Sequence, residues 1–166
     1  MKKKFAAIAA LLASLTACIC VLTACFSIDT EKTFEKSGMR ITLTTAFQEK
    51  DVLSQTVCYE SRSEIVTALK ESFSLMPGFG RYTIEDYTNL ILKNNKLFST
   101  TYTRDGKDYM FFTYEKTVDD KQIYYVATTH KSSDAFWLIQ FACNASEKTE
   151  RVTKFLAYAD TITFFG

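Results

Sequence analysis

The sequence contains one histidine, His130, and any acid–base site that uses an imidazole would have to be built on it. Serine triads and cysteine–histidine dyads both need a base beside the nucleophile. His130 ends an expected strand and is followed by the polar residues 131–134, which are typical of a turn. We therefore expect an exposed histidine at a strand end, and we predict no catalytic residue in the chain.

Two pairs of adjacent carboxylates, Glu85-Asp86 and Asp119-Asp120, are the other candidates for acid–base or calcium chemistry. The first pair falls in the first turn of an expected helix, where negative charge complements the free N–H groups. The second falls in an expected hairpin turn, where aspartate is favoured. Calcium loops need oxygen ligands at alternating positions, and zinc sites need clustered cysteine and histidine. Neither pattern occurs, so we predict no metal and no cofactor.

The N-terminal residues carry a different kind of chemistry. Three lysines at 2–4 precede an apolar run over residues 5–21, which ends at Leu22-Thr-Ala-Cys25. A basic start, an apolar stretch and small residues before a cleavage point are typical of a signal peptide. Leu-Thr-Ala-Cys resembles the lipobox of bacterial lipoprotein signals, in which the cysteine sulfur is acylated and the chain is cut before it. The run is too short and alanine-rich for a spanning helix, which needs about 20 strongly apolar residues. We predict a signal peptide over 1–24 and lipidation of Cys25.

Cys18 is an alternative lipidation site, because Leu15-Thr-Ala-Cys18 spells the same four residues. Cleavage there would leave an apolar N-terminus exposed to water, so we favour Cys25. Burial of acyl chains contributes about 0.8 kcal/mol per CH₂, which is sufficient for an anchor. With either cysteine, we expect the domain to be held at the cell membrane on its extracytoplasmic side, with the membrane as a partner through the N-terminal lipid.

The charge balance bears on partners. Removal of residues 1–24 takes away three lysines and leaves 17 basic against 19 acidic residues, a formal charge of −2. A nucleic-acid binder needs a basic surface, and no basic run remains, so we predict no nucleic-acid partner. The remaining length suits one domain with a core of its own.

Cys58 and Cys143 remain as thiols, and an export compartment permits a disulfide between them, but each also fits as a small buried side chain.

The secondary-structure pattern begins after a polar segment without clear periodicity, which we interpret as a tether over 25–38, followed by a domain over 39–166. Alternation predicts a strand from Met39, with Ile41 and Leu43 on one side. Further strands are expected over 54–60, 64–73, 97–104, 108–116, 122–130 and 134–143, with a short edge strand over 161–164. The segment 134–143 is apolar at both parities, so we expect it mid-sheet and covered on both faces.

Two amphipathic helices are predicted. Thr83-Ile-Glu-Asp86 resembles a capping box and precedes apolar residues at helical spacing, and that helix should end near Asn94. Asn144-Ala-Ser-Glu147 repeats the signature before the second helix. A turn at Asp105-Gly106 predicts a hairpin, and Val118-Asp-Asp predicts another turn. The only proline lies in a loop over 76–81.

Taken together, these elements predict an α+β fold in which one antiparallel sheet of about six or seven strands packs against two helices. The chain resembles small lipoproteins of Gram-positive bacteria with a PsbP-like sandwich domain. The resemblance lies in the order of elements and in three segments: Gly38-Met-Arg-Ile-Thr-Leu, Thr83-Ile-Glu-Asp-Tyr and Ser133-Asp-Ala-Phe-Trp-Leu-Ile-Gln-Phe. The resemblance extends over roughly residues 38–164 and rests on packing motifs. It implies a non-catalytic domain that binds or helps to assemble partners, although a fold alone does not fix a function.

The aromatic residues suggest where binding would occur. Nine rings fall on expected adjacent strands: Tyr102, Tyr109, Phe111, Phe112, Tyr114, Tyr124, Tyr125, Phe136 and Trp137. Most should form core and cross-strand pairs. A sharper hypothesis is that some tyrosines line a sheet face or groove that the helices leave uncovered. The leading expectation is a binding or assembly protein with an envelope protein partner. The alternatives are a solute- or glycan-binding module that uses the aromatic face, and an envelope enzyme that uses carboxylates or His130.

Overall fold

The computed structural model describes residues 29–165. The expected signal peptide over 1–24, both candidate lipidation sites (Cys18 and Cys25) and the first residues of the expected tether lie outside this range. The chain divides into two units, residues 1–30 and 31–166, and the described part of the second is the domain. Among the described residues, no helix combines the length and the hydropathy needed to cross a membrane.

A small antiparallel sheet contains β1 (Glu31–Lys36), β2 (Met39–Thr44) and β9 (Thr163–Phe164), in the order β1-β2-β9. The expected tether over 25–38 is therefore wrong in its second half, where β1 lies. Phe34 is the only buried side chain of β1, so the strand shows no alternation that sequence reasoning could detect. Ser37 and Gly38 turn the chain into β2 with positive φ angles. The domain begins at Glu31 and not at Met39.

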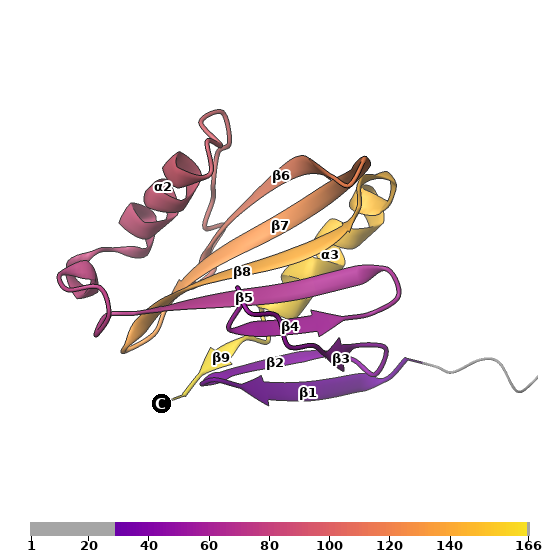
Figure 1. The fold of residues 1–166 in the computed structure, drawn as a ribbon, viewed down its shortest axis with the longest axis horizontal. Helices are drawn as coiled ribbons and strands as arrows, with labels where there is room; N and C mark the ends of the chain where they lie inside the picture. Colours follow the sequence, from indigo (N-terminus) through magenta and orange to yellow (C-terminus); the bar gives the residue numbers. More distant parts are fainter. Residues whose placement is uncertain (1–28, 166) are drawn as a thin grey trace, which may run out of the picture. The chain divides into compact units, whose positions relative to one another are not determined.

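A larger antiparallel sheet has six strands in the order β3-β4-β5-β8-β7-β6 (Figure 1). The expectation of one sheet is corrected to two sheets, because the hydrogen-bonded neighbours of β2 are β1 and β9 and no strand of the larger sheet. The strands of the larger sheet are β3 (Gln48–Glu49), β4 (Val57–Glu60), β5 (Glu64–Ser72), β6 (Met110–Val118), β7 (Lys121–Lys131) and β8 (Ala135–Asn144).

The two predicted helices are present. In α2 (Ile84–Asn94), the Thr83 hydroxyl accepts from the Asp86 N–H while the Asp86 carboxylate accepts from the Thr83 N–H, so the predicted capping box is confirmed. The second predicted helix starts differently. The Asn144 side chain accepts from the Ser146 N–H and begins the short helix η3 (Ala145–Glu147), which leads into α3 (Lys148–Ala159). A second short helix, η2 (Phe79–Arg81), lies in the predicted loop before α2.

The expected strand over 97–104 is wrong. Those residues are mostly irregular, with a turn at 98–99, and only Thr103 pairs, through an isolated bridge to Phe111. The tight hairpin of this region is the one between β6 and β7, where Asp119 and Asp120 both adopt positive φ. Positive φ at both central residues is the geometry of a two-residue hairpin turn, and aspartate tolerates it.

The larger sheet uses its two faces differently. Its inner face packs on α3 and the small sheet in the main core, which includes Tyr59, Trp137 and Phe141 together with Ile41 and Phe155. A second, smaller core lies on the outer face, where α2 packs on one end of the sheet. Since α2 is short and contacts β6 and β7, part of the outer face has no helix over it.

Candidate functional site

The part of the outer face that α2 leaves uncovered is the candidate functional surface. It consists of Ile65 and Thr67 on β5, Ile123 and Tyr125 on β7, and Gln140 and Ala142 on β8, and we call it the open sheet face. The strand register brings these residues together, because Ile65 pairs with Ala142, Ala142 with Tyr125 and Thr67 with Gln140. Residues facing each other in adjacent strands share one side of a sheet.

The open sheet face is hollowed, mainly apolar and accessible. A depression of about 430 Å³ is bordered by these residues together with Gln55, Val118, Asp119 and Lys121. Ile65 is 41% exposed and Val118 is 39% exposed, although both are large aliphatic side chains on strands. A grouped exposure of this kind on a hollowed sheet is typical of a binding surface, whereas single exposed aliphatic residues are common everywhere.

Two tyrosines stiffen one side of the open sheet face. The rings of Tyr114 and Tyr125, which pair across β6 and β7, stack with centroids 4.8 Å apart and planes 5° from parallel. The Gln140 side-chain amide donates to the Tyr114 hydroxyl over 2.5 Å. Burial raises the pKa of Tyr114 to about 12, with a further contribution from Tyr125, so both hydroxyls stay protonated at neutral pH. The pair therefore presents an uncharged, fixed aromatic surface.

Most of the other aromatic rings of the predicted set serve packing. Tyr109, Tyr124 and Trp137 belong to the main core, and Phe111 packs against it. Phe112 and Phe136 belong to the core under α2, with Tyr102 packed against that core. Tyr114 and Tyr125 are the two members of the set that lie beside the open part of the sheet.

Sequence reasoning singled out the tyrosines but missed the aliphatic and amide residues of the surface. The segment around β8 was expected to be covered on both faces, and this holds at Phe136, which stacks on Tyr87 of α2 at 4.4 Å. It fails at Gln140, which is only partly buried and borders the open sheet face. The signal that was present is the glutamine itself, because a polar residue in an otherwise apolar central strand indicates a face without full cover.

His130 lies elsewhere and is not exposed as the sequence suggested. It is 6% exposed, its Nε2 atom lies 2.9 Å from the Thr128 hydroxyl, and its ring packs between Tyr109 and Phe164. Burial lowers its pKa to about 3, so the imidazole is neutral at physiological pH. The prediction failed because the covering groups come from distant parts of the chain, β9 and the loop before β6.

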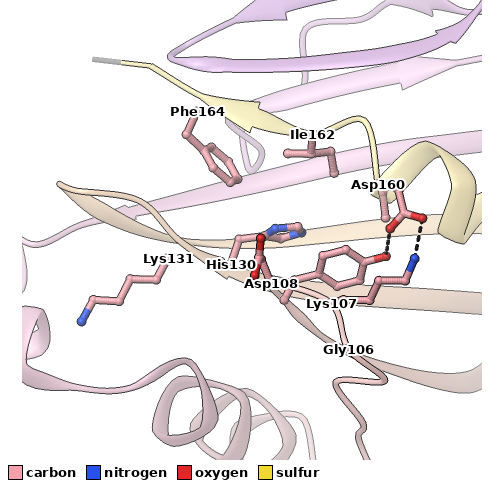
Figure 2. A pocket seen from close by; sticks show the side chains of 10 residues that line it. Gly106, Lys107, Asp108, His130, Lys131, Asp160, Ile162 and Phe164 are labelled. Atoms are coloured by element: carbon pink, nitrogen blue, oxygen red, sulfur yellow. Dashed lines mark hydrogen bonds and ion pairs between the residues drawn. The ribbon is translucent and has the colours of Figure 1, made fainter.

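A depression of about 420 Å³ lies beside His130 and is shown in Figure 2. Its polar wall is built from Lys107, whose ammonium lies 2.6 Å from the Asp160 carboxylate, and Tyr109, whose hydroxyl donates to the same carboxylate over 2.8 Å. Asp160 is therefore already bound by two donors, which hold its pKa below the usual range, with Lys107 contributing most. These contacts fasten the loop before β6 to the end of α3, and they engage Lys107, Tyr109 and Asp160 within the fold.

The remaining chemical candidates occupy structural positions. Asp86 completes the capping box of α2, and Asp119 and Asp120 form the β6–β7 turn. Within residues 29–165, no group of three or more histidine, cysteine or acidic side chains is arranged to hold a metal ion.

Cys58 and Cys143 are both free and buried. The register explains why they do not form a disulfide. Cys58 faces Thr67, which faces Gln140 on the outer side of the sheet, whereas Cys143 packs in the main core on the inner side. The two side chains therefore point to opposite faces of the same sheet.

The fold is shared with known structures although the sequence is not. No protein-family model matches this chain, and no curated protein matches it significantly. The solution structure of cyanobacterial PsbP from Synechocystis is similar, with a TM-score of 0.55 at 10% identity over 86% of this chain and 96% of that one. The Saccharomyces cerevisiae Ran-binding protein Mog1p gives a TM-score of 0.53 at 7% identity over 82% and 96% of the respective chains. A protein from Bacteroides thetaiotaomicron gives 0.51 at 12% identity over 81% of this chain and 48% of that one. The domain therefore has a PsbP-like α+β fold, and at these identities the likeness extends to the fold alone.

Proposed function

We propose that this protein is a lipid-anchored, extracytoplasmic, non-catalytic binding protein of the cell envelope, and that it binds a protein partner through the open sheet face. The observation that carries this proposal is the grouping of exposed Ile65 and Val118 with half-buried Tyr125 in a hollow on an otherwise well-packed sheet. The solvated face of an antiparallel sheet normally carries polar side chains. Here the part of the outer face without a helix exposes the aliphatic side chains of Ile65 and Val118. A partner that covers this part of the sheet would bury the exposed aliphatic side chains.

The proposed anchor is Cys25, on the sequence argument given above. An anchor confines the domain to the membrane surface and so raises its effective concentration toward partners held there. This concentration effect favours a binding role, because a moderate affinity at the open sheet face is then sufficient for stable association.

A non-catalytic role is supported by the positions of the reactive groups. His130 is neutral and enclosed, and its bonded hydroxyl, Thr128, is also buried. The acidic pairs complete a helix cap and a turn. These side chains are occupied by the fold itself, and none of them borders the open sheet face except Asp119, at its rim.

A second candidate function is recognition of a glycan or another small solute at the same surface. The flat Tyr114–Tyr125 stack beside the Gln140 amide favours it, since sugars pack on aromatic rings and bond to amides. The two functions differ in outcome. A small ligand would raise the melting temperature in a saturable way, whereas a protein partner would be recovered covalently by cross-linking.

The test is cross-linking in living cells of the full-length tagged protein, followed by affinity recovery and mass spectrometry, with the Cys25→Ala variant as the control. We expect one dominant envelope protein with the wild type, and its loss in the variant together with release of the variant from the membrane fraction. A variant that stays in the membrane fraction would mean that Cys18 or an uncleaved N-terminal helix is the anchor. Well-expressed, anchored wild type without any cross-linked protein would contradict the protein-partner proposal and lead to a thermal-shift screen with glycans.

A further inference from the structure

The outer edge of β6 is a long strand edge without a neighbour. Thr103 pairs with Phe111 at the beginning of the strand, and from Phe112 to Val118 no strand of residues 29–165 adds to this side. Figure 1 shows β6 as the outermost strand of the larger sheet. An unpaired edge presents a row of backbone donors and acceptors that a further strand can satisfy.

The Thr103 bridge shows which backbone groups point outward. Phe111 donates to the Thr103 carbonyl over 2.9 Å and accepts from the Thr103 N–H over 3.0 Å, so both of its backbone groups face away from β7. Backbone direction alternates along a strand, so Thr113, Glu115 and Thr117 also direct N–H and C=O outward. The residues between them bond to β7, whose register with β6 is continuous.

The other edges of the two sheets are short or guarded. β3 and β9 have two residues each. β1 has six residues, but its side chains include Glu31, Lys32, Glu35 and Lys36, and charge on an edge discourages pairing. The free part of β6 carries one acid and one base, Glu115 and Lys116, among threonine, aromatic and aliphatic residues. It is the long edge with the least protection in the described domain.

We propose that a second copy of this chain pairs antiparallel with β6, with the two-fold axis at Glu115. The seven free residues, Phe-Thr-Tyr-Glu-Lys-Thr-Val, complement themselves in this register. Phe112 faces Val118 of the partner subunit, but its ring is buried under α2, so this position contributes backbone pairing and little side-chain contact. Thr113 faces Thr117 of the partner subunit, and Tyr114 faces Lys116 of the partner subunit, which places an ammonium beside an aromatic ring. The outward-facing backbone groups of Thr113, Glu115 and Thr117 then meet those of the partner.

The two Glu115 carboxylates meet at the axis, and a lysine of the same copy offsets the repulsion between them. Glu115 faces its own equivalent, but its carboxylate is bound by Lys148 of α3 at 2.8 Å. The neighbouring registers are worse. A centre at Lys116 places two ammonium groups face to face and leaves Phe112 and Thr113 beside the turn. A centre at Tyr114 brings Thr117 of the partner subunit against Phe111, whose outward groups Thr103 already occupies.

The arrangement has a consequence for binding. Because facing residues in this register share a side of the sheet, the axis is perpendicular to the joined sheet, and both open sheet faces lie on the same side. A partner with two binding segments would meet two equivalent surfaces, and the second contact would form at high effective concentration.

The test uses the full-length, membrane-bound protein carrying two tags in one cell. Thr113→Cys in one copy and Thr117→Cys in the other face each other in the proposed register, at the Cα separation of about 5.5 Å that a disulfide accepts. Each variant expressed alone places its own cysteines about 14 Å apart, four residues along the strand. Mild oxidation should therefore give a mixed-tag dimer with the two variants together and at least tenfold less with either alone. Thr33→Cys on the β1 edge is the matched control.

Backbone pairing is tested separately. Proline at Glu115 removes an N–H that points outward, so the ladder to β7 is retained. Glu115→Pro added to both cysteine variants should abolish the mixed dimer while circular dichroism shows a folded domain. Cross-linking no greater than that of the Thr33→Cys control, with both cysteine variants folded, would overturn the proposal. A disulfide to a different protein would also overturn it, since the edge would then accept a strand from another chain.

Discussion

Tyr114 and Tyr125 lie face to face across β6 and β7, 4.8 Å apart, directly beside the hollow that α2 leaves uncovered. Their planes are 5° from parallel. This stack explains how an exposed surface stays fixed, because each ring limits the rotation of the other and Gln140 bonds to Tyr114. Rigid aromatic groups lose little conformational entropy on binding, so a surface built on them suits recognition.

A substitution on the open sheet face should separate binding from folding. Ile65 is 41% exposed, so Ile65→Asp should lower the free energy of unfolding by only about 1 kcal/mol, chiefly because aspartate is disfavoured in strands. The same change places a charge in an apolar hollow and should lower recovery of the cross-linked partner at least tenfold. Urea denaturation and quantitative mass spectrometry measure the two effects. Equal partner recovery with the wild type would remove Ile65 from the binding surface.

The buried carboxylate of Glu64 should be important for stability. Its side chain is 2% exposed and lies 2.5 Å from Arg151 and 2.8 Å from Lys154, so it ties β5 to α3. Glu64→Gln leaves both cations without this partner, and because they are partly solvated we expect a loss of about 2 kcal/mol. Glu115→Gln is the control, since its pair with Lys148 is exposed and should contribute about 0.5 kcal/mol or less. Similar losses in the two variants would show that Glu64 gains nothing from its burial.

Stability should fall as the pH is lowered through the range where an ordinary histidine titrates. The pKa of His130 is lowered from 6.5 to about 3, so the unfolded chain takes up a proton that the folded protein does not. The stability that the neutral, buried His130 contributes to the folded protein is complete above about pH 6.5. It is lost toward pH 3 at about 1.4 kcal/mol per pH unit. We expect a loss of about 2 kcal/mol between pH 7.5 and pH 5 by urea denaturation. In His130→Gln this slope should disappear, and an unchanged slope would mean that another group causes it.

The turn between β1 and β2 depends on a glycine for two reasons. Gly38 has a φ of +90°, and a Cβ there would lie 2.7 Å from the Phe165 carbonyl oxygen. Gly38→Ala should therefore destabilise the protein by about 2 kcal/mol or more, combining backbone strain with displacement of the C-terminal segment. Gly106 has a φ of +72° with open space around it, so Gly106→Ala should cost about 1 kcal/mol from the backbone alone. Thermal unfolding of the two variants compares the effects, and equal losses would rule out the contact with Phe165.

The features that sequence reasoning predicted correctly are local ones. The capping box at Thr83 and Asp86 and the turn at Asp119-Asp120 depend on neighbouring residues, and both were found. The features it missed depend on contacts between distant parts of the chain. β1 was taken for a tether because one side chain of six is buried, and the division into two sheets follows from pairing of β2 with the C-terminal β9.

The candidate site also combines local features that the sequence predicts with long-range features that it does not. Tyr125 on the open sheet face and Tyr114 beside it could be expected from aromatic residues on neighbouring strands. The hollow itself could not, because it exists where α2 ends, and the length of sheet that one helix covers is a property of packing. His130 was expected in water for the same reason, since Tyr109 and Phe164 approach it from separate elements.

The most direct test of a partner-binding open sheet face is site-specific photo-cross-linking in living cells, with benzoylphenylalanine at Ile65 of the full-length protein. Thr33, exposed on β1 of the other sheet, is the matched control position. We expect one dominant envelope protein linked from position 65, absent from position 33 and lost when Cys25 is replaced by alanine. The same set of proteins linked from both positions, or none from position 65 in well-anchored protein, would contradict this expectation.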